Sequence, residues 1–362
     1  MRTLSSVATS PERLRDDLVR LAHRGADARE FAFGATRILA RAVSFDWVCV
    51  LTMDPATLVP TGAVDKDGRL ISAYPRLYEI EFGGEDFNAF RWLALSDRNA
   101  ATLSQATGGV LDRSERHREI MGPNGFGDEL RATLVDGDVA WGAVAFLRGA
   151  DRRAFSPADT GLVEAVARHL AEGLRRAMLL DRDAPDPADG EDTAGVVVLA
   201  PDGSTAYTDE VAAAWMDELG ANGSAPPVVT AVAGQARATA TGRTREGRIA
   251  RARVRAKSGR WLVVRGSVLG DGPGAQVAVM IEPTRTHELA PLVADVYRLT
   301  ERERDVTRLV ARGLPTDAIA ARLYLSPWTV QDHLKAIFEK AGVTTRGELV
   351  ARVFFQQRAP QL

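Results

Sequence analysis

The clearest pattern of apolar and polar positions lies near the end of the chain, between residues 299 and 355. Apolar residues recur there at spacings of three and four, which predicts short amphipathic helices with one buried face each. The first predicted helix begins at a capping box formed by Thr300 and Glu303 and ends at Gly313. The second predicted helix follows Thr316, which we expect to be its N-cap residue.

The third predicted helix of this region has the strongest boundaries. Ser326 is a favourable N-cap residue, and Pro327 suits the first helical position because its missing N–H costs nothing there. Gly342 ends this helix, and Thr345 with Glu348 repeats the capping box for a fourth. We expect these inward-facing residues: Val306, Leu309, Val310, Ile319, Ala320, Leu323, Val330, Leu334, Ile337, Phe338, Leu349, Val350, Val353 and Phe354.

The outward face of the third helix carries side chains suited to reading DNA. Its N-terminal half presents Trp328, Thr329, Gln331, Asp332 and Lys335. A recognition helix turns this half toward base edges in the major groove. Glutamine can bind adenine, lysine can bind guanine, and aspartate can accept from cytosine. The alternative is that this outward polar face contacts only solvent.

The whole segment resembles the LuxR-type helix-turn-helix of bacterial regulators. The matching residues are Leu299-Thr300-x-Arg302-Glu303, Ala311-x-Gly313-Leu314, Ile319-Ala320-x-x-Leu323, Leu325-Ser326-x-x-Thr329-Val330-x-x-His333 and Ile337-Phe338-x-Lys340. The resemblance implies an all-α four-helix domain, over residues 295–358, that binds DNA as a dimer. It implies that Gln331, Asp332 and Lys335 contact bases. It also implies phosphate contacts from Thr316, Thr329, His333 and Lys340, although His333 can equally pack at the core edge.

Charge supports this interpretation modestly. From Tyr297 to the end the chain has eleven basic and seven acidic residues, whereas the whole chain carries a net charge of −2. A local basic excess is typical of a module that contacts DNA. Because the excess is small, each copy makes few phosphate contacts, and we expect a homodimer on the DNA.

The first half of the chain, residues 11–180, predicts an α+β domain. We expect helices over 12–23, 28–43 and 157–180, and strands over 45–51, 58–64, 129–135 and 139–147. A helical, loop-rich stretch fills the middle, to about Met121. Gly137 and its aspartate neighbours predict a hairpin between the last two strands.

This order resembles a GAF domain. The residues that carry the resemblance are Phe45 to Leu51, Trp141-Gly142-x-Val144-x-Phe146-x-Arg148, and Phe155-Ser156 with the helix behind them. The resemblance implies a sensory pocket for an unknown small-molecule effector on one sheet face, lined by Trp47, Cys49 and Trp141. The alternative is that these three side chains are ordinary core. We expect Cys49 to be an inert buried thiol, and no metal or cofactor.

Residues 181–192 read as an acidic linker, and a second junction is expected over 283–291. Between them, 193–282 predict a second α+β domain: a strand over 195–200, a helix over 209–219, a Gly/Pro-rich loop, then a three-stranded meander over 248–257, 261–268 and 276–281. This part resembles a small PAS-like domain through Asp202-Gly203 and Ser258-Gly259-Arg260-Trp261.

One strand of this second domain is strongly basic. Arg251, Arg253, Arg255 and Lys257 alternate with small apolar residues, which places the four cations on one sheet face. A solvated outer face is one interpretation. The sharper hypothesis is electrostatic docking, either on DNA beside the binding site or on the acidic linker.

Composition narrows the class of protein. Hydrophobic content is 45% and charged content is 26%, as in ordinary globular proteins. No apolar stretch is long enough to cross a bilayer, the N-terminus lacks an apolar signal core, and the single Cys49 fits a reducing cytoplasm. We see no phosphate-binding Gly-rich loop, nucleophile elbow or paired metal ligands, so we do not expect an enzyme.

The sequence therefore predicts a cytoplasmic, multidomain, DNA-binding transcriptional regulator whose N-terminal sensory domains modulate a C-terminal helix-turn-helix. Expected partners are double-stranded promoter DNA, a second copy of the chain and RNA polymerase, with no membrane. Two alternatives stay open: a sigma-like promoter-recognition factor, and a signal-binding interaction protein with a degenerate DNA-binding tail.

Overall fold

The structure is a computed structural model that describes residues 11–65, 67–179, 193–221, 223–243, 249–272, 274–284 and 286–350. The chain divides into two compact units, Met1–Pro283 and Thr284–Leu362. The expected acidic linker, residues 181–192, lies outside the described residues.

The first unit begins with a five-stranded antiparallel sheet. Its strands are β1 (Trp47–Asp54), β2 (Val59–Asp65), β3 (Ala100–Thr102), β4 (Phe126–Asp136) and β5 (Val139–Gly149), in the order β2-β1-β5-β4-β3. The predicted hairpin joins β4 and β5 through a two-residue turn, Gly137 and Asp138. The predicted α+β character of this region is confirmed.

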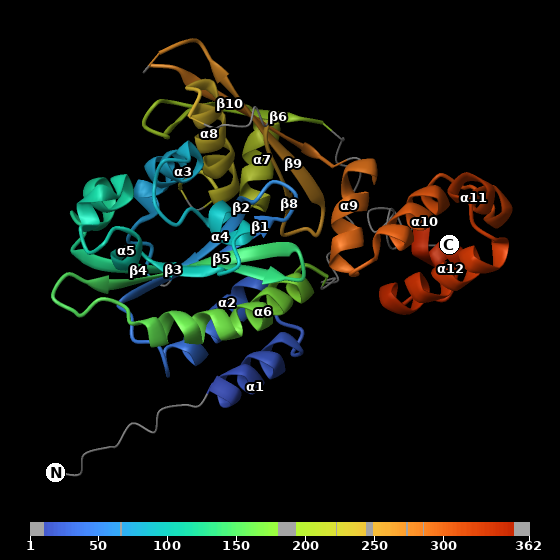
Figure 1. Ribbon diagram of the computed structural model, residues 1–362. Helices are drawn as coiled ribbons and strands as arrows, with labels where there is room; N and C mark the ends of the chain where they lie inside the picture. Colours follow the sequence, from blue (N-terminus) through green and yellow to red (C-terminus); the bar gives the residue numbers. More distant parts are fainter. Residues whose placement is uncertain are drawn as a thin grey trace. The chain divides into compact units, whose positions relative to one another are not determined.

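Helices lie on both faces of this sheet. Figure 1 shows α1 (Pro11–Ala22), α2 (Ala28–Leu39) and α6 (Pro157–Leu179) on one side. A Cβ on Gly142 of β5 would come within 2.5 Å of Leu174, so this glycine lets α6 pack directly on the sheet. The helical stretch from residue 71 to 121 has α3 (Tyr74–Gly83), α4 (Phe90–Leu95) and α5 (Leu103–Ala106), then a π-helical turn, His117–Met121.

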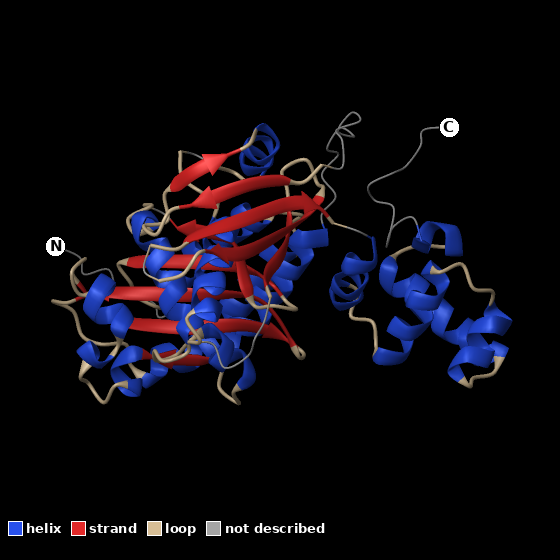
Figure 2. Cartoon of the chain, turned by 90° about the horizontal axis from the view of Figure 1, so that it is seen from above, coloured by secondary structure: helices blue, strands red, loops and turns tan. Residues whose placement is uncertain are grey.

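A second five-stranded antiparallel sheet follows in the same unit. Its strands are β6 (Gly195–Leu199), β7 (Thr205–Thr208), β8 (Ala250–Arg255), β9 (Trp261–Leu269) and β10 (Gln276–Pro283), in the order β7-β6-β10-β9-β8. Figure 2 shows the strands of both sheets in red. The predicted meander is confirmed as β8-β9-β10, with α7 (Glu210–Glu218) after β7. The edge strand β7 was not predicted.

The expected Gly/Pro-rich loop contains a helix, α8 (Pro227–Ala240), which corrects the sequence prediction. Pro227 occupies a first-turn position, where proline is tolerated, and most of the helix is buried. A helix that is buried on every side shows no polar stripe, so the period of its apolar residues was hidden.

The two sheets share one hydrophobic core. A continuous cluster joins apolar side chains of β1 and α3 to those of α8, β8, β9 and β10. Helix α8 lies against α3, and a Cβ on Gly234 would meet Tyr78 at 2.8 Å, so glycine is needed for this close approach. The division of this unit into a GAF-like and a PAS-like domain stays a prediction.

The second unit is helical. It contains α9 (Thr286–Val296), α10 (Glu301–Ala311), α11 (Thr316–Leu323), α12 (Pro327–Ala341) and α13 (Arg346–Val350). Its core includes these predicted residues: Val306, Leu309, Val310, Ile319, Ala320, Val330, Leu334, Ile337 and Leu349. The expected junction over 283–291 is partly helical, because α9 begins at Thr286. Val353 and Phe354 lie outside the described residues.

Candidate DNA-binding surface and a buried cavity

Helix α12 is held at its start by the residues that the sequence singled out. The Ser326 hydroxyl accepts from the Thr329 N–H at 3.0 Å, and Pro327 follows it in the first turn. Before it, Tyr324 adopts a left-handed backbone (φ 56°) that ends α11 and turns the chain into α12. Val330, Leu334 and Ile337 are buried, so the opposite face of α12 is fixed outward.

The three expected base-contacting residues share this outward face. Gln331, Asp332 and Lys335 are all exposed, and Trp328 beside them is 74% exposed. The Gln331 side-chain amide donates to the Thr316 hydroxyl at 3.4 Å. This contact orients Gln331 and leaves its carbonyl oxygen available to accept from a base.

The four expected phosphate-contacting residues do not share one environment. Thr316, Thr329 and His333 are half-buried at the edges of α11 and α12. Thr316 is the first helical residue of α11 and not its cap; Pro315 is the N-cap residue, with no side-chain hydrogen bond. The Thr329 hydroxyl lies 2.8 Å from that of Ser326. Lys340 lies at the far end of α12.

Lys340 also has a partner within its own domain. Its ammonium group donates to the Glu303 carboxylate at 2.6 Å and to the Arg298 carbonyl at 3.4 Å. Glu303 is buried and completes the predicted capping box with Thr300. Burial works to raise the pKa of Glu303, but Lys340 and the Thr300 N–H outweigh it and hold that pKa below its usual value. A phosphate would therefore compete with Glu303 for Lys340.

The capping box expected at the start of α13 is only partly formed. The Thr345 hydroxyl accepts from the Glu348 N–H at 3.0 Å, as expected. The Glu348 carboxylate, however, accepts its hydrogen bonds from the N–H and hydroxyl of Thr344, the residue before Thr345, at 2.7 and 2.9 Å. Arg346 donates to the Leu314 carbonyl and ties the start of α13 to the loop after α10.

A cavity of about 50 Å³ lies in the first unit between β1, β2, β4 and β5 on one side and α3 on the other. Trp47 and Cys49 line it, as the GAF resemblance implies. Trp141 is only 1% exposed but is not among its lining residues. The fourteen lining residues are Trp47, Cys49, Leu51, Pro60, Leu70, Tyr74, Leu77, Tyr78, Glu81, Phe90, Met121, Glu129, Arg131 and Ala145.

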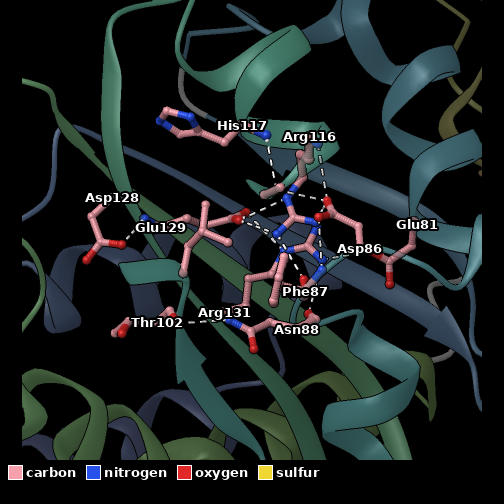
Figure 3. A network of polar contacts seen from close by, with 12 residues as sticks. Glu81, Asp86, Phe87, Asn88, Thr102, Arg116, His117, Asp128, Glu129 and Arg131 are labelled. Carbon is pink, nitrogen blue, oxygen red and sulfur yellow. Dashed lines mark hydrogen bonds and ion pairs between the residues drawn. The ribbon is translucent and has the colours of Figure 1, made fainter. Parts of the chain in front are cut away.

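One side of this cavity is formed by a buried charge network (Figure 3). The Arg131 guanidinium donates to Glu129 at 3.0 Å and to Glu81 at 2.7 Å. Glu129 also accepts from Arg116 at 2.8 Å, and Arg116 donates to Asp86 at 2.7 Å. Burial works to raise the pKa of Glu129, but the two arginines outweigh it and hold that pKa below the ordinary value. The two arginines therefore favour the ionised form of Glu129.

Sequence reasoning missed this network. Glu129 and Arg131 lie two apart on a predicted strand, so a shared face could be predicted from the period of two. Glu129 pairs with Arg116, which in turn pairs with Asp86, and these two residues come from a loop-rich stretch with no period to place them.

The thiol and phenol groups of the cavity are neutral. Burial raises the pKa of Cys49 to about 12, which agrees with the expected inert thiol. Burial also raises the pKa of Tyr74, whose hydroxyl donates to Asp65 at 2.8 Å. Within the described residues no group of histidine, cysteine or acidic side chains is placed to hold a metal ion.

The basic strand β8 does not form a uniform solvated face. Arg253 is buried, with its side chain 7% exposed, and binds Asp54 of β1 through its side chain at 2.6 and 3.1 Å and its backbone N–H at 2.8 Å. Arg255 donates to the Met178 carbonyl at the end of α6, and Lys257 to the Asp217 carbonyl. Arg251 and Lys257 are exposed. The cations thus connect the second sheet to its neighbours in the first unit.

Comparison with known proteins finds relatives for the last part of the chain. Residues 297–353 match the family model described as bacterial regulatory proteins, luxR family. An HTH-type transcriptional regulator of Mycobacterium bovis is 52% identical over 52 residues, which is 14% of this chain and 6% of that protein. The nitrate/nitrite response regulator protein NarL of Escherichia coli is 44% identical over 54 residues, or 15% of this chain and 25% of that one. The chain thus spans a small part of these relatives.

Two solved structures cover more of the chain at low similarity. The phycoerythrobilin-bound GAF domain of a cyanobacterial phytochrome covers 48% of this chain and 98% of its own, with 14% identity and a TM-score of 0.34. Escherichia coli SdiA covers 94% of this chain and 95% of its own, with 12% identity and a TM-score of 0.33. At such TM-scores neither likeness decides the fold or the function. In the part of the chain that the structure describes, no helix combines the length and apolar character of a membrane span.

Proposed function

We propose that this chain, whose residues 297–353 match the luxR family model, is a DNA-binding transcriptional regulator controlled by the unit before that segment. One observation carries the proposal. Helix α12 buries its apolar face and holds Gln331, Asp332 and Lys335 outward in its N-terminal half. That is the half of a recognition helix that enters the major groove.

Each exposed residue has a distinct role in this proposal. Gln331 is oriented by Thr316 and reads adenine, while Lys335 reads guanine. Asp332 accepts from cytosine and repels the helix from other sequences. Thr329, Thr316 and His333 border this face and contact phosphates, which fixes the register on the duplex.

The regulator acts as a homodimer on promoter DNA and contacts RNA polymerase. The small basic excess of residues 297–362 supports the dimer, because a single copy neutralises few phosphates. The one cysteine, buried and unbridged, suits the cytoplasm. No step of this function requires turnover of a substrate.

The first unit is the sensory part of the proposal, with the cavity as its effector site. Helix α3 supplies Tyr74, Leu77 and Tyr78 to the cavity, and α8 packs closely against α3 at Tyr78. A ligand that prefers one position of α3 therefore shifts the arrangement of both sheets, as a population shift requires.

Selection of genomic DNA fragments by the full chain tests the function. We expect a defined sequence to be enriched, with an affinity that falls steeply as salt rises. The matched control exchanges Gln331, Asp332 and Lys335 together for alanine, which leaves the core of α12 intact. Enrichment of the same sequence by the control, or of none by the native chain, would refute the proposed base contacts.

A further inference from the structure

The cavity contains one buried polar atom that the fold leaves without a partner. Trp47 lines the cavity and is 5% exposed, and its indole Nε1–H has no hydrogen-bond acceptor. A buried donor without an acceptor costs about 1–3 kcal/mol. Native structures seldom leave such a group unpaired, so an acceptor from outside the chain is the natural candidate.

The charged groups of the cavity wall and the Tyr74 hydroxyl are paired. Arg131 binds Glu129 and Glu81, and its guanidinium lies 4.0 Å above the Phe90 ring. Glu81 also accepts from the Phe90 N–H at 2.7 Å. Tyr74 donates to Asp65. Among the described lining residues, Trp47 Nε1 is the buried side-chain atom that still lacks a partner.

We propose that this cavity binds a small, uncharged, mainly apolar molecule whose hydrogen-bond acceptor faces the Trp47 indole N–H. The remaining wall suits such a molecule, because Leu51, Leu70, Leu77 and Met121 offer only apolar surface. Calling this molecule the effector rests on the proposed function; the binding itself does not.

The charge network explains why the ligand is neutral. Arg116 and Arg131 face three carboxylates, Glu81, Asp86 and Glu129, so this buried set carries a net charge of about −1. An anion entering the cavity loses its hydration and meets this negative charge. A cation meets aromatic rings and carboxylates, but it brings no acceptor and leaves the Trp47 N–H unpaired.

The volume limits the size of the ligand. A water molecule needs roughly 10–15 Å³ of such space, so 50 Å³ holds a few waters or one compact organic molecule. A short ketone, amide or alcohol fits this limit, whereas a bilin or haem does not. Ordered water is the rival occupant, and the experiment must separate the two.

Titration of the full chain, labelled with ¹⁵N-tryptophan, tests the proposal by NMR. The probe is 2-butanone, compared with propionate and tetramethylammonium, which match it in size as an anion and a cation. We expect 2-butanone to move the Trp47 indole cross-peak downfield and to saturate in the millimolar range, while the two ions leave it in place. The Trp47→Phe variant assigns the peak and keeps an apolar ring in the wall.

Trp141 supplies an internal control. Its indole N–H is also buried and unpaired, but Trp141 does not line the cavity, so its peak should stay fixed throughout. A Trp47 peak that 2-butanone leaves unmoved, that follows either ion equally, or that moves together with Trp141 would overturn the proposal. So would a water signal at Trp47 that 2-butanone does not displace. DNA plays no part here, so failure of this test and failure of the DNA-binding function are distinguishable.

Discussion

Helix α12 and strand β8 each carry a row of polar side chains, and the two rows have opposite surroundings. On α12, Gln331, Asp332 and Lys335 are all exposed. On β8, Arg253 is buried against Asp54, and Arg255 donates to the end of α6. One row is open to a partner outside the chain, whereas the other already holds its own unit together.

The difference shows what periodicity can and cannot decide. A period of 3.6 or 2 states which residues share a face. What covers that face depends on residues far along the chain: Asp54 lies about two hundred positions before Arg253. A basic strand in the sequence is thus compatible with a solvated face and with a buried contact, and only the fold separates them.

The largest expected effect is at the buried pair of this comparison. Asp54→Ala leaves the Arg253 guanidinium buried without its carboxylate, so we expect a loss of about 3–5 kcal/mol in the free energy of unfolding. Chemical denaturation followed by tryptophan fluorescence measures it, because most tryptophans lie in the first unit.

A surface pair of the same unit gives the matched control. Arg98 and Glu164 are 3.3 Å apart and largely exposed on the arginine side, so Glu164→Ala should cost under about 1 kcal/mol. If Asp54→Ala is as mild as Glu164→Ala, the β8 row is not a structural contact. Arg253→Met in the Asp54→Ala background should recover part of the loss.

Sequence reasoning went furthest where structure is local. The caps at Thr300 and Ser326 and the turn before α12 are set by neighbouring residues, and all of them form. It failed at α8, whose valines, threonines and glycine have low helix propensity and whose burial comes from α3 and the second sheet. Strand β7 was missed because its four residues are all exposed, so the sequence shows no alternation of apolar and polar positions there.

The sites follow the same rule. The exposed α12 face follows from helical spacing alone. The placing of Trp47 and Cys49 on one strand face follows from the period of two. The pairing of Arg116 with Glu129 and Asp86 depends on how a loop-rich stretch folds back on β4. Likewise, Lys340 meets Glu303 only because α12 packs across the start of α10.

The exposed row on α12 is tested by measuring how well variants distinguish one base pair from another. Lys335→Ala and Gln331→Ala should each reduce discrimination at one base pair by about 1–3 kcal/mol, with the total affinity for unrelated DNA little changed. Binding isotherms against single-base variants of the selected site measure this. Glu339→Ala, on the same helix but in its last turns, is the control. Equal losses on every sequence would assign Lys335 and Gln331 to phosphates.

A smaller effect is expected at the Glu303–Lys340 pair. It is less buried than the Arg253–Asp54 pair, because Lys340 is partly exposed, and more buried than the polar face of α12. Glu303 has a pKa below its ordinary value of 4.5, so its contribution is present above that pH and is lost as pH falls through the lowered pKa. Glu303→Gln should cost the second unit about 1 kcal/mol at neutral pH, shrinking in acid. Amide hydrogen exchange in α10 measures it, and a cost that grows below pH 4.5 would contradict the assignment.

The smallest effect is expected at Arg251, an exposed residue at the start of the β8 row. Arg251 lies directly opposite Arg265 in the sheet register, and Arg265 already binds Glu282 at 3.0 Å, so Arg251→Glu at this exposed position should change stability by under about 0.5 kcal/mol. DNA affinity and its dependence on salt should also stay the same, because Arg253, Arg255 and Lys257 each have a partner inside the first unit, so the row does not form a docking surface. If Arg251→Glu weakens the salt dependence of DNA binding by about one phosphate contact, then β8 also contacts DNA. In that case β8 and α12 would both be DNA-binding elements, and they would differ only in how many of their polar side chains reach the duplex.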